Sequence, residues 1–421
     1  MIATTPTAGK QYKIKSGDEL NKIASIAYGQ PELWRKIYDA NQTTLKSDDP
    51  DLIFPGEIIL IPQLSEITKL KNDRIKKTLE KEGKDSIKLI IGGFDVKFQA
   101  ISITRTMDTC ADGWQASIGW NPGADENLDE ITKPYSYANA AVYLGGDLII
   151  NGSLYSVTPK LTGTQRGKEL EGWSFTADAI DSSIKPPYEV VKTSLKQRAE
   201  QLISQFGISV VWDLDDDLIF DKMTASSTDK VFQHLLKYAK QKGKLISSTP
   251  EGDMHFIEAN VDGKSVGTIV DGEHGVLEYS AKFDGRKRFN SYKAIGQSPK
   301  KSSKFEIAKD DGVPKSRMTT FSNPDATEGD LKSSAEWKRS TAISEALTIP
   351  FTSTSFYAPN DERWQENTIV TVKSEVISLS EGFNFLIKRV KFNQSTSGNT
   401  TQLDLIPPQA LSGEPLSEIF K

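Results

Sequence analysis

The side chains that could act as metal ligands or nucleophiles in this chain do not form a recognised motif. The chain has three histidines, His234, His255 and His274, and no two of them have the spacing of a zinc protease motif. We therefore expect ordinary structural or surface roles for them. Cys110 is the only cysteine, so no intrachain disulfide can form, and its neighbours do not resemble the surroundings of an activated thiol.

The acidic run Asp213-Leu214-Asp215-Asp216-Asp217 is the best candidate for a calcium-binding loop. An EF-hand loop that began at Asp213 would need a glycine at position 218 and a bidentate glutamate at position 224. The chain has Leu218 and Thr224 at these positions instead. We expect a solvated acidic turn here, and no metal site.

Catalysis by paired carboxylates or by a bound nucleotide is not indicated either. A glycosidase needs two placed carboxylates, and no local pattern selects a pair among the 57 acidic residues. The pairs Gly92-Gly93 and Gly145-Gly146 lack the Gly-x-Gly-x-x-Gly spacing and the following helix of a nucleotide-binding loop. We therefore predict no catalytic residue, no cofactor and no enzymatic activity.

Composition limits the classes of partner. The chain has 421 residues and a formal net charge of -5, which argues against specific binding of nucleic acid. The N-terminal MIATTPTAGK lacks the basic and apolar regions of a signal peptide. The longest apolar runs have four or five residues, whereas a membrane helix needs about 20. We expect a soluble protein of two to four domains that is made in a cytoplasm and has no membrane segment.

The elements begin with a small module at residues 11–63, after an N-terminal arm at 1–10. A strand-like start leads to a turn at Ser16-Gly17-Asp18, and two helical patterns follow on either side of Gly29-Gln30-Pro31. We expect Asn41 to end the second helix in a left-handed conformation. A strand at 57–61 completes the order strand, helix, helix, strand.

This module resembles a LysM domain. The resemblance rests on residues 12–20, on Ile23-Ala24, Tyr28-Gly29 and Asn41, and on 53–56 and 59–62, with a departure at Glu19, where many glycan-binding members have threonine. In that family the glycan groove lies between two loops, so the resemblance implies a groove or a protein-docking surface at nine residues. They are Ser16, Gly17, Asp18, Glu19, Leu20, Ile53, Phe54, Pro55 and Gly56.

A charged linker at 64–85 leads to a first β region. Lys, Arg, Asp and Glu alternate in the linker, which favours a solvated helix or tether. From residue 86 to residue 190 the period changes to short alternating strands, and Gly92-Gly93 and Gly145-Gly146 predict hairpin turns between them. This pattern predicts a small β-barrel or sandwich, which ends near Pro186-Pro187.

Two further domains follow in the sequence. Helical patterns near 195–206 and 229–242, with strands at 208–212, 245–246 and 254–257, predict a small α/β domain over 191–260. Strands return in the last part of the chain, so we expect a second β-barrel-like domain over 261–421. Residues 297–335 are polar and rich in Gly, Pro, Ser and Lys, and we expect a long loop or mobile insertion there.

The region 86–421 resembles the hub proteins of Mu-type phage tails. The similar segments are 199–208, 243–246, 252–256, 363–370, 385–390 and 403–408, and they occur in the order of that family. The resemblance implies a homotrimeric ring in which each chain carries two related barrels. Three copies would then present six similar barrels to a sixfold tail tube above and a threefold spike below.

The sequence therefore predicts a multidomain, mainly β protein of α+β class with a structural role. We expect the hub of a contractile phage tail baseplate or of a related injection particle, in the virion and assembled in the host cytoplasm. The expected partners are the tail tube protein, the central spike protein, other baseplate proteins and tape-measure proteins. The alternative is a protein or hydrolase that the LysM module directs to peptidoglycan.

Overall fold

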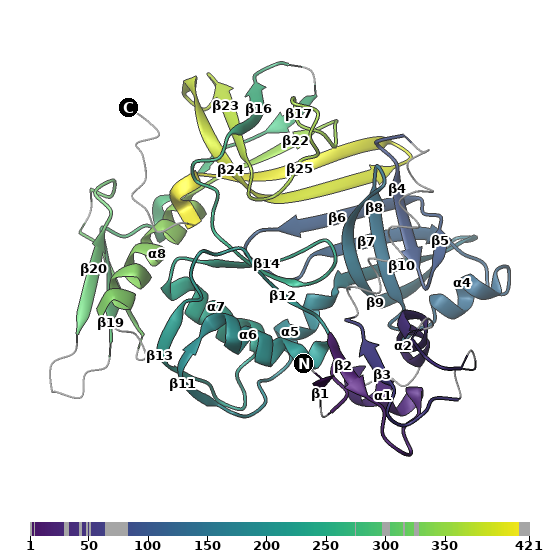
Figure 1. Cartoon of the computed structure of the whole chain (residues 1–421). Coiled ribbons are helices and arrows are strands. Elements are labelled where there is room, and N and C mark those ends of the chain that lie inside the picture. The colour runs from purple at the N-terminus through teal and green to yellow at the C-terminus, as the bar shows by residue number, and fades with distance from the viewer. Residues whose placement is uncertain are drawn as a thin grey trace.

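The computed structural model describes residues 2–3, 5–28, 33–41, 44–47, 49, 52–63, 83–273, 275–296, 304–314, 316–323 and 328–411. Residues 64–82 of the expected linker and His274 therefore lie outside the described residues. The described part is multidomain and mainly β, as the sequence predicts (Figure 1). None of its helices is long and apolar enough to span a membrane.

The N-terminal module has the predicted order of elements. Its strands are β1 (Ile2–Ala3), β2 (Lys10–Lys13) and β3 (Ile58–Ile61), and β2 pairs antiparallel with β3. Its helices are α1 (Leu20–Tyr28) and α2 (Trp34–Asn41). Because successive side chains of β3 point to opposite faces, Ile59 and Ile61 are buried against apolar residues of both helices. The module therefore has its own small core.

Asn41 differs from its prediction, because it is the last residue of α2 and has no positive φ. Its buried amide nitrogen donates to the carbonyls of Ile37 and Leu60, each at 2.7 Å. Its amide oxygen accepts from the Leu60 backbone nitrogen at 2.8 Å. The side chain therefore joins α2 to β3, which a turn-forming role would not require.

The first β region contains seven strands and one short helix. They are β4 (Ile87–Ile91), β5 (Phe94–Val96), β6 (Ala100–Thr106), β7 (Gly113–Gly119), α4 (Glu126–Ile131), β8 (Asn139–Leu144), β9 (Asp147–Thr162) and β10 (Gln165–Ser174). Both predicted Gly-Gly hairpins are confirmed. In each pair the two glycines have φ of 59° and 90°, the left-handed values that a two-residue hairpin turn needs.

The α/β unit follows the first β region. Its helical elements are η2 (Phe175–Ala177), α5 (Asp178–Asp181), α6 (Leu195–Ile203), η3 (Ser204–Phe206) and α7 (Val231–Gln241). Its strands are β11 (Glu189–Ser194), β12 (Val210–Trp212), β13 (Ile219–Thr224), β14 (Leu245–Ser248) and β15 (Met254–Ile257). Ser194 and Gln197 form a capping box that starts α6, and Gly207 ends η3 with a φ of 69°.

The last β region continues the sheet of the first one. Its strands are β16 (Ser265–Val270), β17 (Val276–Tyr279), β18 (Lys282–Phe283), β22 (Leu347–Ser353), β23 (Ile369–Ser374), β24 (Leu379–Ser395) and β25 (Gly398–Ile406). Strand β24 pairs antiparallel with β6, from Arg389 opposite Thr106 to Ser395 opposite Ala100. The two β regions thus share one sheet (Figure 1). They also share one apolar core, in which Phe356 contacts Phe392 edge-to-face.

The prediction of a long loop or mobile insertion at 297–335 is wrong for the residues that the structure describes. A separate sheet forms from β19 (Ser291–Ile295), β20 (Phe305–Lys309) and β21 (Met318–Ser322), and α8 (Glu328–Ala346) packs against it. The core of this unit is small and includes Tyr292 and Leu331. Small and polar residues fill its elements, so the apolar periodicity that marks a helix or a strand is weak here.

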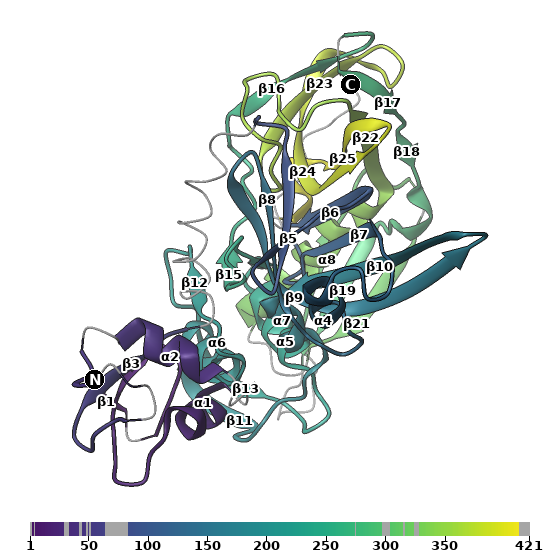
Figure 2. The same ribbon diagram turned by 90° about the vertical axis from the view of Figure 1, so that its right-hand side faces the viewer.

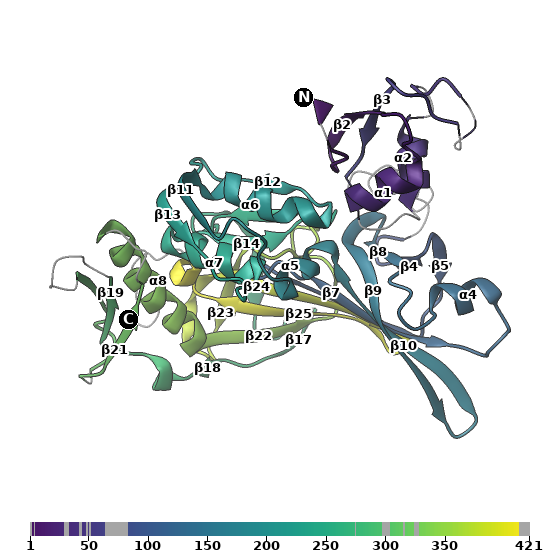
Figure 3. The ribbon, with the colours of Figure 1, turned by 90° about the horizontal axis from the view of Figure 1, so that it is seen from below.

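A long hairpin projects from the first β region. Strand β9 pairs with β8 only as far as Ser153, and β10 pairs with β7 only from Gly167 onward. Beyond Ser153, β9 has only β10 as a neighbour, and the end of the hairpin forms an arm that extends beyond the sheet (Figures 2 and 3). The arm carries charged side chains near its base and the exposed Leu161 near its tip.

Candidate functional site

The nine residues predicted for a groove lie on two adjacent loops of the N-terminal module. The Gly56 nitrogen donates to the Ile14 carbonyl and the Ile14 nitrogen to the Glu57 carbonyl, each at 2.8 Å. These bonds bring the loop before α1 next to the loop before β3. Six of the nine residues are exposed, Asp18 and Ile53 are half-buried, and Leu20 belongs to the module core and is therefore not available to a partner.

Two carboxylates hold these loops in shape. Asp18 Oδ2 accepts from the Tyr12 hydroxyl at 2.8 Å and from the Lys15 nitrogen at 2.7 Å. Burial, together with the Asp18 carboxylate, raises the pKa of Tyr12 to about 12, so its hydroxyl remains a donor at neutral pH. Glu57 accepts from the Phe54 and Lys46 nitrogens at 2.7 and 2.9 Å. These hydrogen bonds hold both loops in a defined conformation.

Apolar side chains dominate the surface beside these loops. Leu52, Phe54, Ile58 and Leu60 are between 38% and 49% exposed. Ile58 and Leu60 lie on the face of β3 that points away from the module core. Exposed apolar side chains that gather on one surface are typical of contact with another macromolecule.

A second notable site is a buried ion network where the two β regions meet the α/β unit. Arg105 on β6 donates from Nε to Glu366 Oε1 at 2.8 Å, and its Nη1 lies 3.2 Å from Asp112 Oδ2. Its remaining donors bond the carbonyls of Ile149 and Ser248 at 2.6 and 3.1 Å. One guanidinium therefore joins segments from all three parts of the chain.

The pKa values of the two carboxylates of this network shift in opposite directions. Burial raises the pKa of Asp112 to about 6, against the attraction of Arg105. Burial also acts against ionisation of Glu366, but Arg105 outweighs it there and lowers the pKa of Glu366. The close contact of Arg105 with Glu366 accounts for this difference, since the guanidinium lies nearer to Glu366 than to Asp112.

Replacing Asp112 by asparagine should change how stability depends on pH. Because the pKa of Asp112 is raised in the folded protein, its ionisation removes stability as the pH rises from about 4 to about 6. The variant lacks this ionisation, so its free energy of unfolding relative to wild type should increase by about 1–3 kcal/mol over that range. Urea unfolding of both proteins at several pH values measures the difference, and a constant difference would contradict the assignment.

The sequence did not identify this network. Arg105, Asp112 and Glu366 are isolated charged residues in strands or loops, and Glu366 is 261 residues from Arg105. Their only local signal is position, because Arg105 falls in a strand whose neighbours alternate between buried and half-buried residues. A charge on the buried face of a strand needs a partner, but the pattern does not say which.

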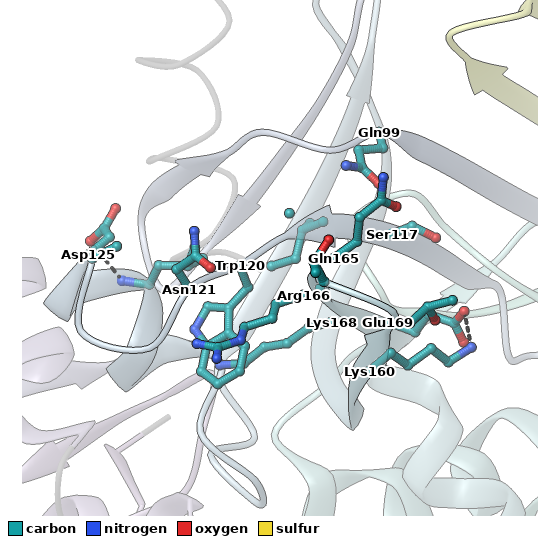
Figure 4. Close-up of a pocket in the computed structure, with 17 residues that line it drawn as sticks. Gln99, Ser117, Trp120, Asn121, Asp125, Lys160, Gln165, Arg166, Lys168 and Glu169 are labelled. Atoms are coloured by element: carbon teal, nitrogen blue, oxygen red, sulfur yellow. Dashed lines mark hydrogen bonds and ion pairs between the residues drawn. The ribbon is translucent and has the colours of Figure 1, made fainter.

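An open pocket of about 770 Å³ lies between the arm, the end of β7 and α4 (Figure 4). Trp120, Arg166 and Lys168 lie together in it, and Lys160 and Glu169 form an ion pair at its edge. The Lys168 ammonium lies 4.0 Å from the centre of the Trp120 ring and donates to Thr132 Oγ1 at 2.7 Å. Burial lowers the pKa of Lys168, although Asp129 opposes this effect.

The cysteine and histidine side chains that could act as nucleophiles or metal ligands lie apart from one another. Cys110 and His234 are buried in the α/β core or against it, and burial raises the pKa of the Cys110 thiol. His255 bonds Asp213 Oδ2 at 2.6 Å on the surface. Within the described part of the chain, no three His, Cys, Asp or Glu side chains come together as a metal site.

Two segments match known domain families. Residues 176–258 match the second domain of gp44-like baseplate hub proteins. Residues 327–414 match the fourth domain of the Mu phage baseplate assembly protein GpP. The first match covers the α/β unit, and the second covers α8 and the strands β22 to β25 of the last β region.

Similar proteins extend the match to most of the chain. The baseplate hub protein gp44 of Escherichia phage Mu is 20% identical over 325 residues, which cover 73% of this chain and 84% of that protein. The 43 kDa tail protein of prophage MuSo2 from Shewanella oneidensis has the same fold, with a TM-score of 0.69 and 22% identity over 77% of this chain and 99% of that one.

A different protein matches a short stretch of the chain. The potassium binding protein Kbp of Escherichia coli is 46% identical over 61 residues, which are 14% of this chain and 40% of Kbp. The chain therefore shares only a local segment with Kbp.

Proposed function

We propose, because the chain is similar to Mu-type baseplate hub proteins over most of its length, that it is the structural hub of a contractile-tail baseplate or of a related injection particle. The observation that carries this proposal is the match to the Mu hub protein over 325 residues, supported by the shared fold of the Shewanella prophage tail protein. The place of such a protein is the tail of the virion, and its role is structural, without catalysis.

We further propose that three copies form a ring between the tail tube and the central spike. The two β regions support this arrangement because they form one continuous sheet and share a core. A chain with two such regions in a fixed relation turns a threefold ring into a pseudo-sixfold surface, which a sixfold tube requires. The ion network around Arg105 keeps that relation fixed.

Cryo-electron microscopy of intact tails tests the proposal. Three copies on the tail axis, between tube and spike, are expected. Six copies at the periphery would make the chain a different baseplate component and would exclude the trimeric adapter. Its absence from the particle would exclude the hub itself.

We propose that the N-terminal module is a LysM domain that docks to a neighbouring baseplate protein. Its apolar surface at Leu52, Phe54, Ile58 and Leu60 favours protein contact, because these side chains lie beside the two hydrogen-bonded loops. Glycan binding by the same loops is the alternative, and it would direct the particle or a hydrolase to peptidoglycan. The two options differ in which residues they need.

Replacing Ile58 and Leu60 together by threonine should release the module from the assembled baseplate. Threonine suits a strand, so the module should remain folded while it loses apolar contact area. We expect the density of the module in tail particles to weaken, while the hub itself is still incorporated. The matched control is Ile26→Thr on α1, which changes another exposed apolar residue and should leave the density unchanged.

Co-sedimentation with purified cell-wall sacculi addresses the alternative. If the wild-type chain binds sacculi and the exposed loop variant Phe54→Ser abolishes binding, the glycan role is supported. Unchanged density of the module in the Ile58 and Leu60 variant would then count against protein docking. Clearing of peptidoglycan by the purified chain would overturn the non-enzymatic role.

A further inference from the structure

Three cations, Lys160, Arg166 and Lys168, line the pocket beside the arm, and among them only Arg166 forms no ion pair with a residue that the structure describes. Arg166 is exposed at the pocket, and its guanidinium makes no hydrogen bond or ion pair with any residue that the structure describes. Lys168 is only 5% exposed, and its nearest carboxylate oxygen, on Asp129, is 3.9 Å away. An ammonium this deeply buried favours a compensating negative charge.

The carboxylates around the pocket already have other partners. Asp125 caps α4 by accepting from the Leu128 nitrogen at 3.0 Å. Asp129 accepts from Trp120 Nε1 and from the Gly123 nitrogen, and the Trp120 bond is the main cause of its lowered pKa. Glu169 pairs with Lys160. The pocket therefore presents a cation at its mouth, an indole ring and a buried ammonium, a combination that fits an anionic ligand.

The form of the pocket favours an acidic peptide over nucleic acid. Binding of a nucleic acid depends on neutralising several phosphates in a row. Only Arg166 is both exposed and unpaired here, and the carboxylates of Asp125 and Glu169 lie close by and would repel further phosphates. A short loop that brings one or two carboxylates to the exposed Arg166 needs only this one unpaired cation.

The chain itself carries such a loop. Asp213–Asp217 follows β12 in the α/β unit, and its last three aspartates are exposed. Within the described residues, the carboxylates of Asp215 and Asp216 have no hydrogen-bond or ion-pair partner, while Asp217 lies 3.9 Å from Lys196. The loop thus presents two unpaired carboxylates, and the pocket presents one unpaired guanidinium, within the residues that the structure describes.

We propose that the pocket at Trp120, Arg166 and Lys168 binds the Asp215-Asp216 loop of a second copy of this chain. Strand β12 and helix α4 lie apart in all three ribbon views, so the two surfaces are on separate parts of the molecule (Figures 1, 2 and 3). When a surface on each copy binds a different surface on the next, the contacts generate a closed ring if the rotation permits. The inference rests on the proposed trimer and assigns one of its contacts.

A charge exchange tests the contact in the full-length chain. Arg166→Glu should weaken self-association at least about tenfold, as should Asp215→Lys with Asp216→Lys, because each places like charges together. Combining the three substitutions should restore association to within about threefold of wild type. Mass photometry over a concentration series measures the oligomers, and circular dichroism checks that each variant is folded. The control is Lys185→Glu, which reverses an exposed charge outside the pocket.

The outcomes separate this inference from the trimer itself. Trimers that are unaffected by either single-surface variant would overturn the contact and leave the trimer standing. A wild-type chain that stays monomeric at all concentrations would overturn both. A second measurement mixes differently tagged chains, one with Arg166→Cys and one with Asp215→Cys. A disulfide that links one tagged chain to the other through positions 166 and 215 supports the contact. The absence of this disulfide in preformed trimers contradicts the contact.

Discussion

Replacing Arg105 by alanine should lower the free energy of unfolding of the joined β regions by about 3–5 kcal/mol. The substitution removes the guanidinium and leaves Asp112 and Glu366 as two buried carboxylates without their shared counter-ion. It also leaves the carbonyls of Ile149 and Ser248 without a donor from this side chain. Urea unfolding at neutral pH, followed by tryptophan fluorescence and circular dichroism, measures the loss.

An exposed ion pair provides the control for Arg105. Lys97 and Asp95 approach to 2.8 Å, but the Lys97 side chain is 84% exposed. Because water solvates both charges in the unpaired state, Lys97→Ala should cost less than about 1 kcal/mol. A similar loss in both variants would show that burial of the Arg105 network contributes nothing. Arg105→Lys should fall in between, because an ammonium keeps the charge but cannot bond two carboxylates and two carbonyls at once.

Replacing Gly152 by alanine should destabilise the first β region by more than about 3 kcal/mol, or prevent its folding. A Cβ atom at this position would lie 1.8 Å from the carbonyl oxygen of Trp173 and 2.7 Å from the Cα of Ser174. Both atoms are backbone, and they belong to β10, which pairs with β9 at this point. A flexible side chain could move aside, but these backbone atoms could move only if the ladder opened.

Gly119 is the matched control for Gly152. It lies in β7 of the same sheet, and the nearest atom to an added Cβ would be Gln99 Nε2 at 3.6 Å, an ordinary contact. Alanine there should change the free energy of unfolding by less than about 1 kcal/mol. Thermal unfolding of the two variants beside wild type measures the contrast. Equal stability of both variants would mean that the close approach of β9 and β10 at Gly152 is not maintained in solution.

The elements that the sequence predicted are those whose cause is local. The two Gly-Gly hairpins follow from backbone conformations that only a few residue types adopt easily. The helices α6 and α7 follow from apolar residues at helical spacing, and each has a buried face as expected. The module at 11–63 was predicted in the correct order for the same reason.

The features that the sequence did not predict depend on contacts between distant residues. Strands β6 and β24 pair with each other, but many other strands of the chain show the same alternation of buried and exposed side chains. No local pattern therefore selects this pairing. The helix α8 begins at Glu328, inside the segment that we expected to be a long loop or mobile insertion, and its first turns are polar and small, so no apolar periodicity marks them. The pocket beside the arm is built from β7, α4 and β10, and only the folded hairpin brings Trp120 and Lys168 together.

The pairing of β6 with β24 also sets an order of events during synthesis. Strand β6 is translated about 280 residues before its partner segment Arg389–Ser395, which at roughly 5–20 residues per second is a delay of roughly 15–60 s. During that time one edge of β6 has no strand beside it, and open strand edges are where chains aggregate. Completion of the C-terminal strands closes that edge. A chain that stops before Arg389 would therefore leave this edge of β6 open, and we expect such a truncated chain to aggregate in the cell.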